Sequence, residues 1–245
     1  MSLRQFYVSL PSTQLRAREL VTEGCPDGTW VVAGIQTAGL GRLDHRWASP
    51  PGGLYLSRVG PDLPDAGSLI PLAFGAGLHD LLQEAWSVPT VLKWPNDLLL
   101  PGTDGRSRKI AGILPERVQG PYGPRTVLGV GLNVRSPLEA YPAEIRDRVG
   151  RIADRHLPPP PLEEVEDRVL AVLARIEADL GSRDGPGRWL DRSREILFGR
   201  GRPAWVDGVP VGRIREIAPD GSLLVDGPAG PSSIRSGELV VEEPT

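Results

Sequence analysis

Hydrophobic residues recur at helical spacing in several segments of the chain. Between positions 78 and 85 they occupy i, i+3, i+4 and i+7, which predicts a helix with one buried face, beginning after Ser68 as N-cap. Residues 162–180 show the same spacing and are followed by Gly181, a residue typical of helix C-caps. Two shorter helices are predicted, one at residues 13–23 with Ser12 or Thr13 as N-cap and one at residues 187–197.

Short runs of β-branched and aliphatic residues predict strands in two groups. The first group covers residues 5–9, 29–35, 54–59, 90–94, 98–100, 109–114 and 126–134, and we expect the last two to pair. The second group contains Asp-Gly turns and covers residues 203–206, 209–217, 223–225, 232–235 and 239–242. The pattern predicts an α+β fold in two parts. A larger domain with a mixed sheet occupies residues 1–197, and a small five-stranded β-barrel occupies residues 198–245.

Composition narrows the class of protein. The chain has 245 residues, 40% of them hydrophobic, and a formal net charge of −3, unlike the basic surface of most nucleic-acid-binding proteins. Cys25 is the single cysteine, which excludes an intramolecular disulfide and a thiolate metal cluster. We find no charged-then-apolar leader and no apolar run long enough to cross a bilayer. We therefore expect a cytoplasmic protein that binds neither nucleic acid nor a membrane.

Lysine is rare in this chain, because arginine has replaced it almost everywhere. Lys93 and Lys109 are the only lysines among 28 basic residues. Lysine has a compact point charge whereas arginine has a planar fork, so a retained lysine indicates a position where the compact charge is needed. Lys93 opens the string Lys-Trp-Pro-Asn-Asp, and Lys109 opens Lys-Ile-Ala-Gly-Ile-Leu. Both strings lie at predicted strand ends, where we expect the edge of a site.

The stretch at residues 34–57 leads from one predicted strand to the next through a loop that combines glycine with basic and aromatic residues. Gly39 and Gly41 allow the backbone to approach a ligand closely. Arg42 offers a fork for phosphate oxygens, and Trp47 offers a flat ring. The chain has neither a Walker pattern nor a complete dinucleotide-binding glycine fingerprint, so a nucleotide would be held by another scheme.

The strand predicted at residues 126–134 contains two glycines, Gly129 and Gly131. Glycine inside a strand often marks the close approach of a ligand or of another backbone. Asn133 lies at the end of this strand. His79, on the helix after Ser68, has no partner motif around it, so we expect a structural histidine.

Five groups of residues occur in an informative order. They are Ser12-Thr13-Gln14 with Gln36, Gly39-Leu40-Gly41-Arg42 with Trp47, Lys93-Trp94-Pro95-Asn96-Asp97, Lys109-Ile110-Ala111-Gly112-Ile113-Leu114, and Gly129-Val130-Gly131-Leu132-Asn133. Together they resemble the ordered motifs of the biotin protein ligases. The two lysine-containing strings are specific in combination, whereas the glycine loop alone is not. The resemblance covers about residues 5–195 and implies the class II synthetase-like fold of that family, with an SH3-like C-terminal barrel.

The resemblance implies a two-step ligase reaction. Biotin and ATP would give biotinyl-5′-AMP and pyrophosphate, and a lysine of a biotin carboxyl carrier protein or domain would then displace AMP. Biotin, and ATP with Mg²⁺, are the implied substrates, and no permanently bound cofactor is expected. Because the first motif begins at Ser12, we expect a monofunctional enzyme without the DNA-binding domain that some relatives have.

The resemblance also implies roles for individual residues. Lys109, Arg42 and Asp97 would act in catalysis, and Asp97 would also lie near Mg²⁺. The residues implied to bind biotin are Ser12, Thr13, Gln14, Gln36, Leu40, Gly41, Arg42 and Gly112. Those implied to bind the nucleotide are Arg42, Trp47, Asn96, Lys109 and Asn133.

Three positions depart from the family pattern. Leu40 replaces an arginine of the usual Gly-Arg-Gly-Arg turn, His45 stands where another arginine is common, and Gln14 stands where asparagine is usual. A lipoate-type acyl ligase of the same fold and a non-catalytic biotin- or nucleotide-binding regulator are the alternatives. We favour the ligase because binding alone would not require both Lys109 and Asp97. The oligomeric state, including a homodimer, and the identity of the acceptor stay open.

Overall fold

A seven-stranded sheet forms the larger part of the structure, a computed structural model that describes residues 3–43 and 45–242. The strand order is β1-β2-β3-β7-β6-β5-β4. The strands are β1 (Arg4–Leu10), β2 (Trp30–Gln36), β3 (Leu54–Gly60), β4 (Val91–Lys93), β5 (Asp97–Pro101), β6 (Ser107–Gly120) and β7 (Gly123–Leu132). β1 and β2 are parallel and the other neighbouring pairs are antiparallel, so the predictions of a mixed sheet and of β6 pairing with β7 are confirmed.

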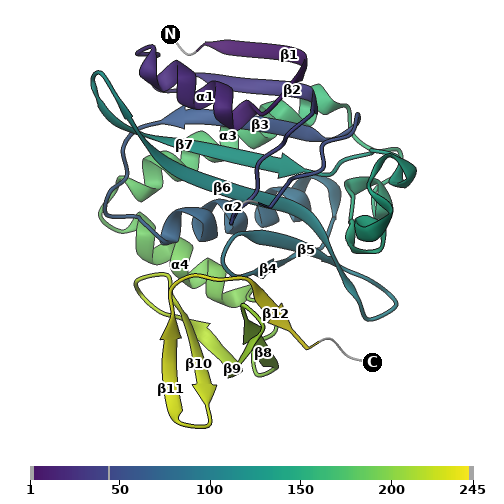
Figure 1. The fold of residues 1–245 in the computed structure, drawn as a ribbon, viewed down its shortest axis with the longest axis vertical. Helices are drawn as coiled ribbons and strands as arrows, with labels where there is room; N and C mark the ends of the chain where they lie inside the picture. The colour runs from purple at the N-terminus through teal and green to yellow at the C-terminus, as the bar shows by residue number, and fades with distance from the viewer. Residues whose placement is uncertain (1–2, 44, 243–245) are drawn as a thin grey trace.

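Helices cover both faces of this sheet (Figure 1). α1 (Thr13–Thr22) packs on one face, where its buried alanine, leucine and valine meet valines of β2, β3 and β7. α2 (Leu69–Trp86) and α3 (Leu162–Leu180) pack on the other face, and α4 (Gly185–Glu195) follows. Because neighbouring side chains of a strand point to opposite faces, a sheet covered on both sides needs consecutive apolar residues, as in Val31-Val32-Ala33 of β2.

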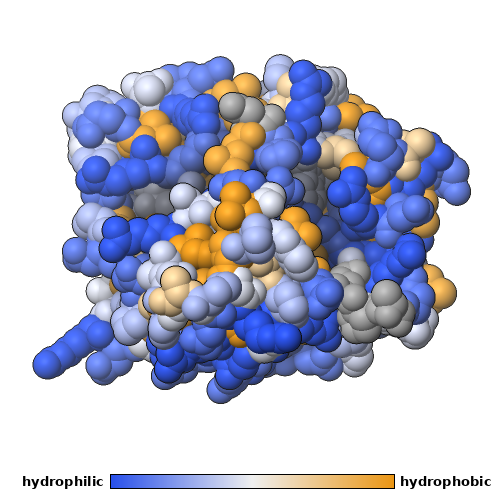
Figure 2. Space-filling model, turned by 60° about the horizontal axis from the view of Figure 1, so that its bottom comes forward, coloured by the Kyte–Doolittle hydropathy of each residue, from blue (hydrophilic) through white to orange (hydrophobic). Residues whose placement is uncertain are grey.

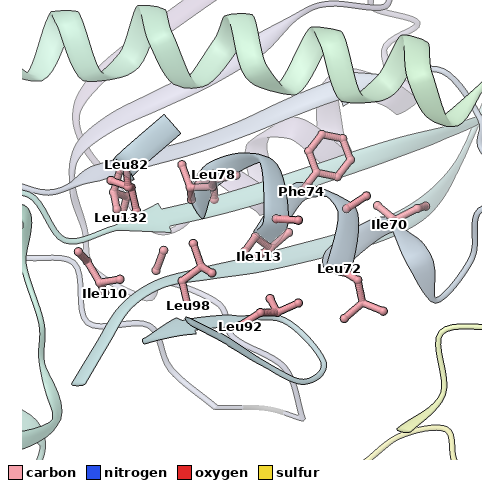
Figure 3. Close-up of a cluster of buried hydrophobic side chains, with 14 of the residues drawn as sticks. Ile70, Leu72, Phe74, Leu78, Leu82, Leu92, Leu98, Ile110, Ile113 and Leu132 are labelled. Atoms are coloured by element: carbon pink, nitrogen blue, oxygen red, sulfur yellow. The ribbon is translucent and has the colours of Figure 1, made fainter. Parts of the chain in front are cut away.

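The main core lies between α2, α3 and the sheet. Figure 3 shows part of it, with side chains of α2 facing side chains of the central strands. The labelled members are Ile70, Leu72, Phe74, Leu78, Leu82, Leu92, Leu98, Ile110, Ile113 and Leu132. Three short 3₁₀ segments connect β7 to α3: η1 (Leu138–Ala140), η2 (Ala143–Arg148) and η3 (Ile152–Asp154).

A second sheet of five strands lies at the end of the molecule opposite β1 (Figure 1). Its strands are β8 (Pro203–Val206), β9 (Val209–Ile217), β10 (Leu223–Gly227), β11 (Gly230–Ile234) and β12 (Leu239–Val241), in the order β11-β10-β9-β8-β12. The five predicted strands are therefore present. The prediction of a closed barrel is not confirmed, because β11 and β12 form opposite edges and do not pair with each other within the described residues.

The second sheet is joined to the first by hydrogen bonds and by shared core. Leu92 in β4 accepts a hydrogen bond from the Phe198 backbone at 2.8 Å and donates one to Ile196 O at 2.8 Å. The Trp94 indole donates to Gly221 O at 3.0 Å. One continuous hydrophobic cluster includes residues of both sheets. The segment after α4 is thus hydrogen-bonded to β4, the edge strand of the larger sheet.

Ser12 and Ser68 were both predicted as N-caps, and only Ser12 makes a capping hydrogen bond through its side chain. Ser12 caps α1, because its Oγ accepts a hydrogen bond from Gln14 N at 3.2 Å. Ser68 precedes α2 but makes no side-chain capping bond, so that part of the prediction is wrong. Its own backbone is already helical, at φ −67° and ψ −13°, and the turn at Gly221 packs closely against it. None of the described helices is both long and apolar enough to span a membrane.

Candidate active site

One cavity of about 830 Å³ is lined by every residue that the sequence analysis assigned to the site. The residues come from the start of α1, the end of β2, the loop after β2, the turn between β4 and β5 with the first residue of β5, the first half of β6, and the position that follows β7. The cavity continues to the segment 237–241 of the second sheet. Hydrophilic residues cover most of the molecular face on that side, and hydrophobic residues gather near its middle (Figure 2).

One end of the cavity is a network of uncharged polar groups. Gln36 Oε1 accepts hydrogen bonds from Thr13 N at 2.8 Å and from Thr13 Oγ1 at 3.1 Å. Gln36 Nε2 donates to Ser49 Oγ at 2.8 Å, which fixes the orientation of the amide. Thr13 Oγ1 also lies 2.9 Å from Ser57 Oγ, a hydroxyl that the sequence analysis did not single out. These donors and acceptors suit a neutral polar head group rather than an ion.

Gln14 is held rigidly beside this network. Its side chain is buried, and its Oε1 accepts a hydrogen bond from Ser57 Oγ at 3.0 Å. Its Nε2 donates to Leu114 O at 3.3 Å and to Val127 O at 3.4 Å. A Cβ at position 129 would lie 2.6 Å from Gln14 Oε1 and would collide with it. Glycine at position 129 therefore makes room for the glutamine side chain.

Trp47 packs flat against the sheet at a pair of glycines. Gly112 and Gly131 face each other in the register of β6 and β7. A Cβ at position 131 would lie 2.5 Å from Trp47 Nε1, and one at position 112 would lie 3.0 Å from Trp47 Cζ3. The Lys109 ammonium lies 5.1 Å from the ring centroid, within the range of a cation–π contact. The close approach predicted at Gly131 is therefore made by this indole.

Charged groups gather next to the indole. Lys109 Nζ lies 2.7 Å from Asp97 Oδ1, and the Lys109 side chain is 37% exposed. Arg42 Nη1 donates to Asn96 Oδ1 at 3.3 Å, and Asn96 Nδ2 donates to Ile113 O at 2.9 Å. Asn96 in the turn between β4 and β5 therefore orients Arg42, and Asp97 at the start of β5 orients Lys109. Two cations with one carboxylate leave a net positive charge for an anionic ligand.

Asn133 lies at the far side of the same cluster. Its Nδ2 donates to Lys109 O at 3.2 Å, and its Oδ1 accepts from Tyr141 Oη at 3.1 Å. Burial raises the pKa of Tyr141, so the hydroxyl stays protonated and can donate this bond. Tyr141 lines the cavity but was missed in the sequence, because it lies in the irregular segment before η2. His79 is not among the lining residues, and its Nδ1 pairs with Thr90 Oγ1 at 2.9 Å, as expected of a structural histidine.

The sequence model of the biotin/lipoate A/B protein ligase family matches residues 6–133, more than half of the chain. The chain belongs to this family. The matched stretch contains every predicted site residue, from Ser12 to Asn133. Lys109, Arg42 and Asp97 of the charged cluster and the residues of the polar network therefore all lie within the matched stretch.

Individual members of the ligase family are similar to this chain to different extents. The bifunctional ligase/repressor BirA of Bacillus subtilis is 37% identical over 142 residues, which cover 56% of this chain and 42% of that protein. The biotin–[acetyl-CoA-carboxylase] ligase of Paracoccus denitrificans is 29% identical over 247 residues, which cover 93% of this chain and 96% of that protein. The structure of the biotin protein ligase from Aquifex aeolicus in complex with biotin and ATP is 25% identical, covers the whole of both chains and has a TM-score of 0.83.

Proposed function

We propose that this protein is an ATP-dependent biotin–protein ligase. The observation that carries the proposal is the joining, in one cavity, of a neutral polar network with a cluster of Lys109, Arg42 and Asp97. In the first step the carboxylate of biotin attacks the α-phosphorus of ATP, and the bond to pyrophosphate breaks. In the second step the amine of an acceptor lysine attacks the acyl carbon of biotinyl-5′-AMP, and AMP leaves.

The charged cluster meets the electrostatic need of the first step. A carboxylate and a phosphate about 4 Å apart repel by about 4 kcal/mol at an effective dielectric near 20. Cations held in place before the reaction offset this repulsion without further reorganisation. Lys109 would lie at the junction of the carboxylate and the phosphate, and Arg42 on the phosphate side. The bond to Asp97 and the indole of Trp47 support this position for the ammonium.

The neutral network suits the head group of biotin, a cyclic urea with two donors and one acceptor. Ser12, Thr13, Gln14 and Gln36 would bind this group, and Ser57 is added to them because it bonds both Thr13 and Gln14. Leu40, Gly41, Arg42 and Gly112 would line the remainder of the biotin site. All of them line the cavity.

The adenylate would extend from the charged cluster toward Trp47, Asn96 and Asn133. The side-chain amide of Asn133 is hydrogen-bonded at both ends, to Lys109 O and to Tyr141 Oη, so its orientation is fixed. We therefore expect Asn133 to contact adenine as a fixed positioning group. Mg²⁺ would enter with ATP, bound through the phosphates, and Asp97 is the carboxylate beside that position. We expect no permanently bound cofactor.

The finer organisation is also part of the proposal. We divide the chain into a ligase domain at residues 1–197 and an SH3-like module at 198–245, of which residues 1, 2, 44 and 243–245 lie outside the described part. The acceptor would be a biotin carboxyl carrier protein or domain, and no nucleic acid or membrane would be a partner. A cytoplasmic location stays a prediction, and the oligomeric state stays open.

Biotin-dependent exchange of labelled pyrophosphate into ATP tests the first step, and transfer of label to an isolated biotin carboxyl carrier domain tests the second. We expect both activities, with lipoate supporting neither. Exchange with lipoate but not biotin would instead establish the lipoate-type alternative, which belongs to the same family. Binding of biotin without any exchange would establish the non-catalytic regulator.

A further inference from the structure

A chain of hydrogen bonds runs from two backbone carbonyls to Thr13 at the neutral end of the cavity. Gln14 Nε2 donates to Leu114 O at 3.3 Å and to Val127 O at 3.4 Å. A carbonyl oxygen can only accept, so the amino group of Gln14 faces these two oxygens and Oε1 faces the other way. There Ser57 Oγ donates to Gln14 Oε1 at 3.0 Å. The two carbonyls therefore decide the orientation of Gln14 and, with it, the direction of the Ser57 hydroxyl.

The direction of the Ser57 hydroxyl in turn limits Thr13. The two hydroxyl oxygens lie 2.9 Å apart, a distance at which one proton has to lie between them. Each hydroxyl has a single proton, and that of Ser57 is directed at Gln14 Oε1. The Thr13 proton therefore lies toward Ser57, or is shared with Gln36 Oε1 at 3.1 Å. In either case this proton is used within the protein, and the lone pairs of Thr13 Oγ1 remain for a ligand in the cavity.

The amide of Gln36 is fixed by the same logic. Ser49 Oγ donates to Trp47 O at 3.2 Å, so it has to accept from Gln36 Nε2, which lies 2.8 Å away. At the other end, Gln36 Oε1 accepts from Thr13 N, a group that can only donate. One N–H of Gln36 therefore remains for a ligand. The cavity thus presents a fixed acceptor on Thr13 and a fixed donor on Gln36.

Burial makes these directions costly to change. Thr13, Gln14 and Ser57 are all buried among the described residues. If the Thr13 hydroxyl turned to donate into the cavity, its oxygen and that of Ser57 would face each other without a proton. A buried polar atom that loses its partner in this way is strongly unfavourable.

We propose that Gln14 and Ser57 are positioning residues that hold the hydroxyl proton of Thr13 inside the protein, so that Thr13 Oγ1 meets the ligand only as a hydrogen-bond acceptor. The inference rests on the proposed function, because it concerns the chemistry of the head group. A cyclic urea has an N–H beside its carbonyl and matches an acceptor next to a donor. A ring with an oxygen in place of that N–H turns lone pairs toward Thr13. Gln14 and Ser57 contribute to this choice through Thr13.

The test compares biotin with two cyclic carbamate analogues, in each of which one of the two urea N–H groups is replaced by a ring oxygen. Isothermal titration without ATP gives the dissociation constants. We expect wild type to bind the isomer with its ring oxygen at Thr13 about 10- to 100-fold more weakly than biotin. Thr13→Val identifies this isomer, because its penalty relative to biotin should disappear there. Penalties unchanged for both isomers in Thr13→Val would overturn the inference.

Two variants release the Thr13 proton by different routes. Ser57→Ala removes the oxygen that accepts it. Gln14→Met keeps a long side chain but removes the acceptor for the Ser57 proton, so Ser57 can donate to Thr13 instead. In both variants the Thr13 hydroxyl can turn toward a ring oxygen, and the penalty should fall about fivefold or more. A wild-type penalty retained in either variant would overturn the inference.

Ser193→Ala is the matched control for the loss of a buried hydroxyl. Ser193 is as fully buried as Ser57, its Oγ donates to Leu72 O and Trp189 O, and it is not among the residues that line the cavity. This variant should keep the wild-type penalty. A general loss of stability weakens the binding of biotin and of the carbamate alike, so the ratio of the two constants separates positioning from stability.

Neutron diffraction from deuterium-exchanged crystals of the free protein tests the same inference without a ligand. We expect the Ser57 deuteron to be directed at Gln14 Oε1, and the Thr13 deuteron at Ser57 or Gln36. A Ser57 deuteron directed at Thr13 would overturn the inference. If wild type binds no biotin, the proposed function fails, and the deuteron positions still decide whether Gln14 and Ser57 make Thr13 an acceptor.

Discussion

Replacing Lys109 by arginine tests whether the cavity needs a compact ammonium or only a positive charge. The ammonium lies 2.7 Å from Asp97 Oδ1 and 5.1 Å from the centroid of Trp47. On the backbone side, a Cβ at position 112 would lie only 3.3 Å from Lys109 Cε. A carboxylate, an indole and a strand backbone thus bound the space around the charge, and a planar guanidinium has to turn to keep its contact with Asp97.

The expected loss follows from this geometry. A displacement of about 1 Å of a group that contacts reacting atoms can cost about 100-fold in rate, which corresponds to about 2.7 kcal/mol in the barrier. Complete removal of a stabilising charge costs about 100- to 1,000-fold in comparable sites. We therefore expect Lys109→Arg to be reduced about 100-fold and Lys109→Ala only moderately further.

Initial rates of biotin-dependent ATP–pyrophosphate exchange measure this effect, with circular dichroism to confirm folding. The matched control is Arg108→Lys, the reverse exchange at the neighbouring position of β6, where the side chain pairs with exposed Asp104 outside the cavity lining. It should retain the wild-type rate. An exchange rate of Lys109→Arg within about threefold of wild type, less than 1 kcal/mol, would refute the requirement for a compact charge.

Three other variants test packing at the site and in the core around it. Gly131→Ala should displace Trp47 and lower the free energy of unfolding in urea by about 1–3 kcal/mol. The KM for ATP in the exchange assay should rise. An unchanged KM would show that the indole does not contact the nucleotide. Trp94→Phe removes the hydrogen bond to Gly221 O, and we expect a loss of about 1 kcal/mol in urea unfolding. Burial lowers the pKa of His79, so its stabilising effect is present above the unfolded value of about 6.5 and lost as pH falls. The free energy of unfolding should therefore decrease more steeply between about pH 7 and pH 5 in wild type than in His79→Gln, and parallel curves would contradict this.

Local patterns in the sequence were sufficient for most elements, and the family resemblance located most of the site, but neither identified Ser57 or Tyr141. The helix predicted at residues 162–180 has those bounds in α3, because a long amphipathic stripe with a terminal glycine is a local signal. The strands predicted at residues 90–94, 109–114 and 126–134 correspond to β4, part of β6 and β7, but β6 continues to Gly120 and β7 begins at Gly123, beyond the predicted bounds. The site residues were found because five short motifs together resemble those of the biotin protein ligases, and each motif contributes residues to one cavity.

Contacts between distant segments were decided only by the tertiary structure. Gly129 and Gly131 were expected to admit a ligand or a backbone, but they accommodate the side chains of Gln14 and Trp47, which come from other elements. Over the residues that the structure describes, the second sheet is open, because closure depends on pairing between β11 and β12, which no local pattern specifies. Glu238 reaches the cavity only because the second sheet docks against β4, about 145 residues away along the chain. Periodicity reports which face of an element is buried, whereas the partner that buries it is set by packing of the whole chain.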